Sequence, residues 1–133
     1  MAACTVAVAV VLSGCEPLDQ GELSREIEGV ASLAAEGAVL ADEVAQQETK
    51  RTFARVHARE LADSAEHSAE RLTDAHPAEG LADATGKAIA LSDDVSGAIG
   101  AVEVAPDDAA AADETSERLR ALVQKLRNLE DSL

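Results

Sequence analysis

The chain has 133 residues, with 26 acidic against 11 basic side chains and a formal net charge of −15. A negative charge of this size repels polyanions, which excludes nucleic acid as a partner and disfavours adsorption to anionic lipid surfaces. The chain has no Trp or Tyr and one Phe, and because strands draw on aromatic and β-branched residues whereas Ala, Leu, Glu and Arg favour helices, the composition predicts an all-α protein.

The start of the chain has the pattern of a secretory signal. Residues 5–12 form an apolar run that is too short to span a bilayer as a helix. The residues before this run contain no Lys or Arg, which signal peptides usually carry there. The end of the run and the residues after it are Leu12, Ser13, Gly14 and Cys15. These four residues resemble the lipobox of bacterial lipoproteins.

The resemblance implies that a signal peptidase removes residues 1–14 and that Cys15 becomes the first residue of the mature protein. It also implies a diacylglyceryl group on the sulfur of Cys15, which would anchor the protein to the inner or outer membrane, outside the cytoplasm. Cys4 leaves with the signal, so the mature chain retains no thiol for a disulfide, a zinc site or a nucleophile. We expect residues 15–133 to form one all-helical domain.

The first predicted helix covers residues 19–47. Asp19 and Glu22 have the spacing of a capping box, which marks a helix N-terminus. Apolar residues then recur at alternating spacings of three and four, as one face of a helix requires. This stripe consists of Leu23, Ile27, Val30, Ala34, Gly37, Ala41 and Val44, and it is widened by Leu33 and Leu40.

The second predicted helix covers residues 49–75. No Gly or Pro lies between Gly37 and Pro77, so one unbroken helix through residues 46–50 also fits the pattern. We favour a break there, with Thr49 as the N-cap, because it gives segments of similar length. The second stripe consists of Ala54, Ala58, Leu61, Ala65, Ser68, Leu72 and Ala75, with Phe53 and Val56 beside it.

The third and fourth predicted helices cover residues 77–102 and 106–132. Pro77 and Pro106 are expected in their first turns, where a helix tolerates proline. The third stripe consists of Leu81, Ala84, Ala88, Leu91, Val95, Ala98 and Val102, supported by Ile89 and Ile99. We attribute the glycines of this segment to the close approach of a neighbouring helix; they are Gly80, Gly86, Gly97 and Gly100. The fourth stripe consists of Ala112, Leu119, Leu122, Leu126, Leu129 and Leu133.

Four amphipathic helices joined by short turns run antiparallel to their neighbours. The sequence therefore predicts an antiparallel up-down-up-down four-helix bundle. The alternative is a long helical hairpin that dimerises, because the same apolar stripes would satisfy it.

Charge is distributed unevenly along the predicted helices. Residues 16–48 carry nine acids against Arg25 alone, whereas residues 49–76 carry five of each sign. Within the second segment Arg51, Arg55 and Arg59 follow one another at i,i+4 positions on one helix face. We interpret this stripe as ion-paired with acids of the first or last helix, and the alternative is a patch that contacts a partner.

The histidines do not form a recognised metal motif. His57 and His67 lie ten residues apart on one helix, about 15 Å along its axis, which is too far to share an ion. His76 is expected at a turn, and the Glu-x-x-His pairs of di-iron bundles and the haem motif Cys-x-x-Cys-His are absent. A site that joins Asp63 and His67 to a carboxylate of another helix remains the alternative.

Sequence motifs of catalysis are also absent. The chain has no Gly-x-Ser-x-Gly elbow, no glycine-rich phosphate loop and no His-Glu-x-x-His. We therefore assign no catalytic residue, no metal ligand and no cofactor apart from the lipid on Cys15. The expected function is that of a lipid-anchored, non-catalytic bundle that acts as an interaction or structural module in the bacterial cell envelope. The alternative is a lipoprotein whose bundle binds a metal or a small ligand.

Overall fold

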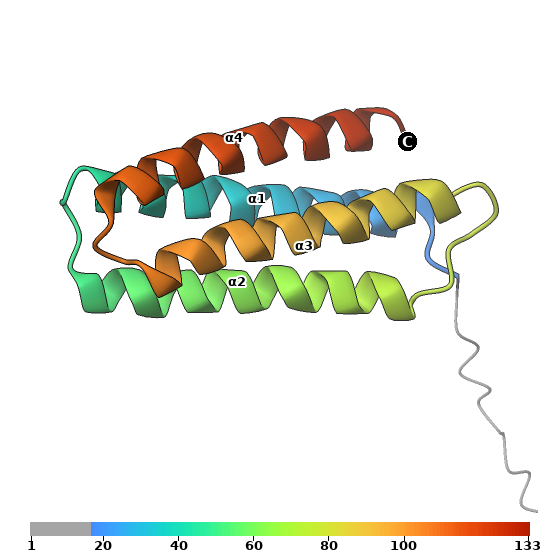
Figure 1. The fold of residues 1–133 in the computed structure, drawn as a ribbon. Coiled ribbons are helices and arrows are strands. Elements are labelled where there is room, and N and C mark those ends of the chain that lie inside the picture. The colour runs from blue at the N-terminus through green and yellow to red at the C-terminus, as the bar shows by residue number, and fades with distance from the viewer. Residues whose placement is uncertain (1–16) are drawn as a thin grey trace, which may run out of the picture.

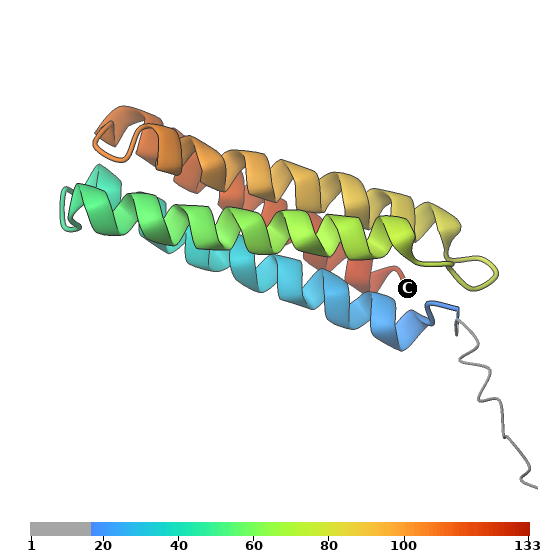
Figure 2. The ribbon, with the colours of Figure 1, turned by 90° about the horizontal axis from the view of Figure 1, so that it is seen from below.

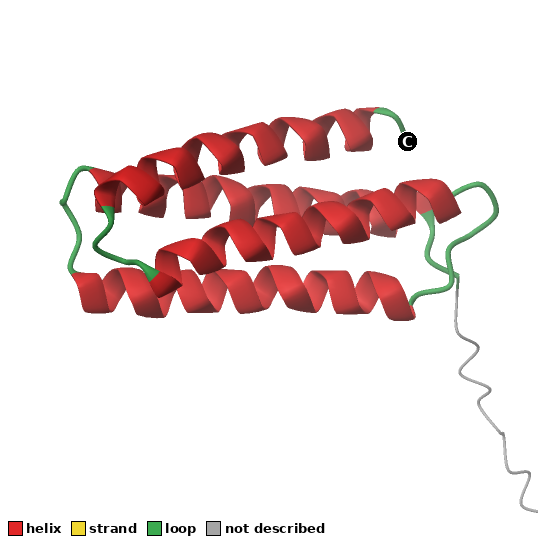
Figure 3. Cartoon of the chain, viewed as in Figure 1, coloured by secondary structure: helices red, strands yellow, loops and turns green. Residues whose placement is uncertain are grey.

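A computed structural model describes residues 17–133 as an antiparallel four-helix bundle (Figure 1). The helices are α1 (Gln20–Ala45), α2 (Arg51–Asp74), α3 (Ala82–Val104) and α4 (Ala109–Asp131). They run up, down, up and down, and the described part of the chain contains no strand (Figure 3). The predicted fold is confirmed. A single chain forms the bundle, whereas the alternative required two copies of a long helical hairpin. The predicted signal and Cys15 lie outside the described residues.

The helices pack as two tight pairs. α1 makes most of its contacts with α4, and α2 makes most of its contacts with α3. α3 and α4 join the two pairs, whereas α1 and α2 touch much less. α1 also meets α3 across the bundle, while α2 and α4 lie on opposite sides (Figures 1 and 2). The cross-section is therefore a flattened diamond with its most open side between α1 and α2.

The two ends of the bundle carry different parts of the chain. The proximal end holds Leu18, the α2–α3 loop and the C-terminus, and the distal end holds the α1–α2 and α3–α4 turns (Figure 1). In the stretch 17–133, every helix is too short or too polar to cross a membrane.

The predicted stripes of α1, α2 and α4 form the core. All their members are buried except Leu33, Ala75 and Leu133, which are half-buried. The largest fully buried side chains come from all four helices: Leu23, Ile27, Leu72, Ile99, Leu119 and Leu126.

The stripe predicted for α3 is partly wrong. Leu91 is only half-buried, as are Leu81, Ala84 and Ile89, whereas Ser92 and Thr85 are buried. The Ser92 hydroxyl donates to the carbonyl oxygen of Ala88 at 2.8 Å, and the Thr85 hydroxyl donates to that of Leu81 at 2.9 Å. Because each hydroxyl is satisfied by its own helix, the buried face of α3 can include polar residues that the apolar pattern missed.

The glycine explanation offered for the third helix is also wrong. A Cβ atom on Gly86, Gly97 or Gly100 would meet nothing within 4 Å, and Gly80 lies in a loop with a φ of 86°. The glycine at a close helix contact is Gly37 of α1. A Cβ atom there would stand 2.7 Å from Cγ1 of Ile99, so the absence of a side chain at Gly37 lets α1 meet α3.

The start of α1 and the break between α1 and α2 follow the sequence signals, with one exception at the N-cap of α2. Asp19 accepts a hydrogen bond from the Glu22 amide at 2.8 Å and donates its own amide to Glu22, which confirms the capping box. The break between the first two helices is confirmed at residues 46–50. Lys50, and not Thr49, is the N-cap of α2, and its side chain makes no capping bond.

Neither inter-helix proline lies in a helix. The Leu18 amide donates to the His76 carbonyl at 2.8 Å, and the Ala78 amide donates to the Leu18 carbonyl at 3.0 Å, which holds Pro77 in an extended loop. α3 therefore begins at Ala82, later than predicted.

The start of α4 is displaced in the same way. Pro106 lies in the turn before α4, because Asp108 is the N-cap and accepts a hydrogen bond from the Ala111 amide at 3.0 Å. α4 therefore begins at Ala109, and the proline belongs to the connection and not to the first helical turn.

Candidate functional site

The arginine stripe of α2 pairs with α3 and the turn that follows it. Arg59 contacts Oε1 of Glu103 through Nε at 2.7 Å and through Nη2 at 2.6 Å. Arg51 lies 3.5 Å from Asp107, and Arg55 makes no ion pair within residues 17–133. Ion pairing is therefore confirmed for two of the three arginines. Asp107 falls in the segment predicted as the start of the fourth helix, whereas Glu103 lies on α3, which was not a predicted partner. The stripe faces α3 and not α1.

Other ion pairs join α1 to its neighbours. Arg71 of α2 donates to Glu26 at 2.8 Å near the proximal end. Asp42 of α1 accepts hydrogen bonds from two residues of α4, the fully buried Ser116 at 2.5 Å and the exposed Arg120. Asp42 therefore links the tight α1–α4 pair at the distal half of the bundle.

The histidines are spread along α2 and the loop after it. His67 is exposed, and its Nδ1 lies 3.2 Å from Glu70 on the same helix. Asp63 and His67 line the same surface hollow, but in residues 17–133 no three His, Cys, Asp or Glu side chains are grouped closely enough to hold a metal ion. His76 contributes its backbone carbonyl to the bond with Leu18, in the loop where the sequence places it.

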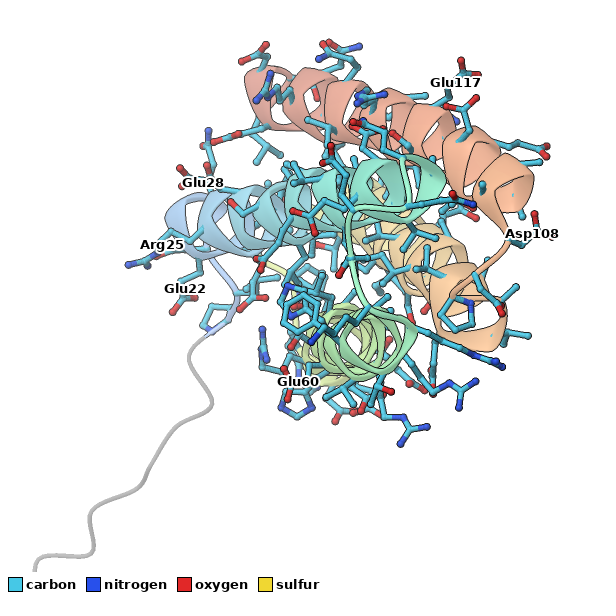
Figure 4. The ribbon with its side chains drawn as sticks, turned by 90° about the vertical axis from the view of Figure 1, so that its left-hand side faces the viewer. Glu22, Arg25, Glu28, Glu60, Asp108 and Glu117 are labelled. Atoms are coloured by element: carbon cyan, nitrogen blue, oxygen red, sulfur yellow. The ribbon has the colours of Figure 1, made fainter. Side chains whose placement is uncertain are left out.

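Three surface hollows lie in a row between α1 and α2, on the open side of the bundle, and we call this row the α1–α2 groove. Their volumes are about 690 Å³ at the proximal end, about 580 Å³ midway and about 270 Å³ at the distal end. Gly29 and Leu33 of α1 face Ser64 and His67 of α2 in the middle hollow. Seen along the bundle from the distal end, Glu22 and Arg25 project outward from α1 and Glu60 projects from α2 (Figure 4).

The distal end of this groove carries exposed apolar side chains. Val39 of α1 is 58% exposed, and Phe53 and Val56 of α2 are 55% and 51% exposed. Val39 and Phe53 line the distal hollow, and Val56 follows Phe53 by one helical turn. We call these three residues the distal apolar patch. Exposed apolar side chains that gather at one place mark an interaction surface more often than isolated ones do.

His57 fixes the position of the aromatic side chain in this patch. Its ring stacks on Phe53 with the centroids 5.5 Å apart, and its Nε2 lies 3.0 Å from Oε1 of Glu36 on α1. Its Nδ1 lies 4.0 Å from Glu60 on α2. His57 therefore bridges the groove and holds Phe53 between the two helices.

The sequence alone indicated part of this apolar surface. Phe53 and Val56 stood beside the second stripe, but Val39 was not singled out, although it also lies beside the stripe of its own helix. The approach of Val39 to Phe53 depends on how α1 and α2 face each other in the bundle, which no pattern along one helix contains.

No protein-family model matches this chain, and no curated protein or solved structure is significantly similar to it. The interpretation of the groove therefore depends on its own shape, exposed apolar side chains and charge.

Proposed function

We propose that the protein is a lipid-anchored, non-catalytic helical module that contacts a partner in the bacterial cell envelope. The observation that carries this proposal is the place of the lipobox-like tetrapeptide relative to the fold. Only Glu16 and Pro17 separate Cys15 from Leu18, and Leu18 is bonded through its backbone to the loop between α2 and α3. The lipidated residue and the folded domain would thus adjoin each other.

This spacing gives the anchor a mechanical consequence. Three residue steps span about 11 Å at most, so lipid on Cys15 would hold the proximal end close to the bilayer. The backbone hydrogen bonds of Leu18 with His76 and Ala78 would then keep the α2–α3 loop close to the bilayer as well. The distal end, where the apolar patch lies, is then left free to meet another protein.

Three buried hydroxyl groups support a non-catalytic role because each of them has a structural use. Ser92 and Thr85 are bonded to carbonyls of their own helix, and Ser116 is bonded to Asp42 across the α1–α4 pair. These bonds satisfy hydroxyl groups that would otherwise destabilise the bundle. The groove, by contrast, is open and lies on the surface, where it suits a macromolecular partner better than an enclosed substrate.

Replacement of the proposed lipidated cysteine tests this function. In native cells, the wild-type protein should incorporate radiolabelled fatty acid and sediment with membranes, because two or more acyl chains hold a protein stably at a bilayer. Cys15→Ala should lose both the label and membrane association. Cys4→Ala is the matched control, since it removes the other cysteine, and it should behave like the wild type. A Cys15→Ala variant that is still labelled and membrane-bound would refute the anchor.

A further inference from the structure

We infer that the α1–α2 groove binds a cationic amphipathic helix from a partner protein, with the distal apolar patch as the main contact. The inference rests on the proposed interaction function and names its surface and the chemistry of the partner. It does not depend on the lipid anchor, so the two can fail separately.

The packing of the bundle leaves a place for one more helix. Because α1 packs on α4 and α2 packs on α3, the side between α1 and α2 is the least closed. The middle and distal hollows lie along α1 from Arg25 to Glu43, a length of about 27 Å at 1.5 Å per residue. Gly29 has no side chain and nothing near its Cβ position, so a partner helix can approach the middle of the groove closely. A helix of about 18 residues would match this length.

The distal patch supplies the apolar anchor that such a helix needs. Val39 and Phe53 stand on opposite walls of the distal hollow, and Val56 extends the patch along α2. An amphipathic helix docks by placing side chains at i, i+3, i+4 and i+7 into an apolar groove. Since His57 already holds the Phe53 ring by stacking, less side-chain freedom is lost on binding.

The charge around the patch selects a cationic partner. Glu36 and Glu43 line the distal hollow from α1, and the exposed Glu60 lies beside His57 on α2. No Lys or Arg lines this hollow. Basic side chains at the margins of the partner's apolar face would meet these carboxylates, and the net charge of −15 would attract them from a distance.

The same charges disfavour a second copy of this chain as the occupant. Two copies would each bring a net charge of −15, and like charges brought together at an interface oppose association. The arginine stripe of α2 does not offset this at the distal hollow, because Arg51 and Arg59 are paired on the α3 side. Arg71 of α2 lines the middle hollow, but it is paired with Glu26 of α1.

A direct test uses a designed peptide and residues 16–133, which include all four helices and the core cluster of the described residues. The probe is an 18-residue helical peptide of leucine and lysine, with the leucines on one face. Calorimetry at physiological ionic strength should show one peptide bound per protein. Two control peptides should bind at least tenfold more weakly: one with the same residues shuffled so that the leucines share no face, and one with glutamate in place of lysine.

Substitutions then locate the binding surface. Val39→Ser combined with Phe53→Ser should weaken binding at least tenfold without lowering the melting temperature much, because both side chains are exposed. Val104→Ser is the matched control, since Val104 is 82% exposed at the end of α3 and does not line the groove. Glu36→Gln combined with Glu43→Gln should weaken binding and reduce its dependence on salt.

Three results would overturn the inference. The first is equal binding by the shuffled peptide, and the second is unchanged binding by the variant that combines Val39→Ser and Phe53→Ser. The third is a dimer in sedimentation experiments that Phe53→Ser dissociates, since a second copy would then occupy the patch. Loss of peptide binding with intact lipid labelling would refute the groove alone, and peptide binding without lipid labelling would refute the anchor alone.

Discussion

The Cγ1 atom of Ile99 lies 2.7 Å from the point where a Cβ atom on Gly37 would stand. Cδ1 of Leu119 lies 3.3 Å from the same point, so side chains of α3 and α4 both occupy the space beside this glycine of α1. This contact lies across the bundle, between α1 and α3 (Figure 1). The lack of a side chain at Gly37 leaves room for Ile99 and Leu119 there.

Gly37→Ala should lower the free energy of unfolding by about 1–3 kcal/mol, because a methyl group forced into a filled core displaces its neighbours. Urea denaturation followed by circular dichroism measures this change. Gly97→Ala is the control, since its Cβ position is open and α3 gains a better helix former; it should raise stability by about 0.5–1 kcal/mol. If Gly37→Ala is as stabilising as Gly97→Ala, the close contact does not exist.

Leu122→Asp should destabilise the bundle by several kcal/mol, because Leu122 is buried and an unpaired charge there is expensive. Leu91→Asp should cost clearly less, since Leu91 is half-buried and the new carboxylate can reach water. Thermal unfolding of the two variants in parallel gives the comparison. Equal losses would show that Leu91 is as deeply packed as the sequence pattern suggested.

Asp42→Ala should cost about 1–3 kcal/mol, because it leaves the buried Ser116 hydroxyl without its acceptor. Adding Ser116→Ala should recover part of the loss, since the unsatisfied group is then removed as well. Glu117→Ala, at an exposed position of α4, should change stability by less than about 0.5 kcal/mol. Denaturant titration of the four proteins, with the wild type as reference, checks all three expectations.

Arg59→Ala should lower stability by no more than about 1 kcal/mol, because its pair with Glu103 is at the surface and is screened by water and salt. Arg55→Ala should have a smaller effect still. Both variants should bind the leucine and lysine peptide as the wild type does, since the stripe faces α3. A strong loss of peptide binding in either variant would show that the arginine stripe is part of the surface that contacts the partner.

The fold was predictable where one helix face differs sharply from the other. In α1 the apolar residues at spacings of three and four alternate with acids, so Leu23, Ile27 and Val30 could only face inward. In α3 apolar residues and alanines occur on several faces, and the pattern placed Leu91 in the core, whereas the structure buries Ser92. The energetic balance between these two faces depends on the packing of α2 and α4 against α3.

The connections and the groove depended on tertiary contacts. Pro77 is compatible with a first helical turn, and it is the pairing of Leu18 with the loop that holds this segment extended. The distal apolar patch combines Val39 with Phe53, which come from different helices and line the same hollow between α1 and α2. The groove therefore could not be predicted without knowing how the four helices are arranged.

The mass of the mature protein extracted from membranes tests the central claim most directly. Mass spectrometry of the N-terminal peptide should show a chain that begins at Cys15 and carries a diacylglyceryl group on its sulfur, with or without a further acyl chain on the amino group. An N-terminus at any other residue, or an unmodified Cys15 thiol in the membrane-derived protein, would contradict the account.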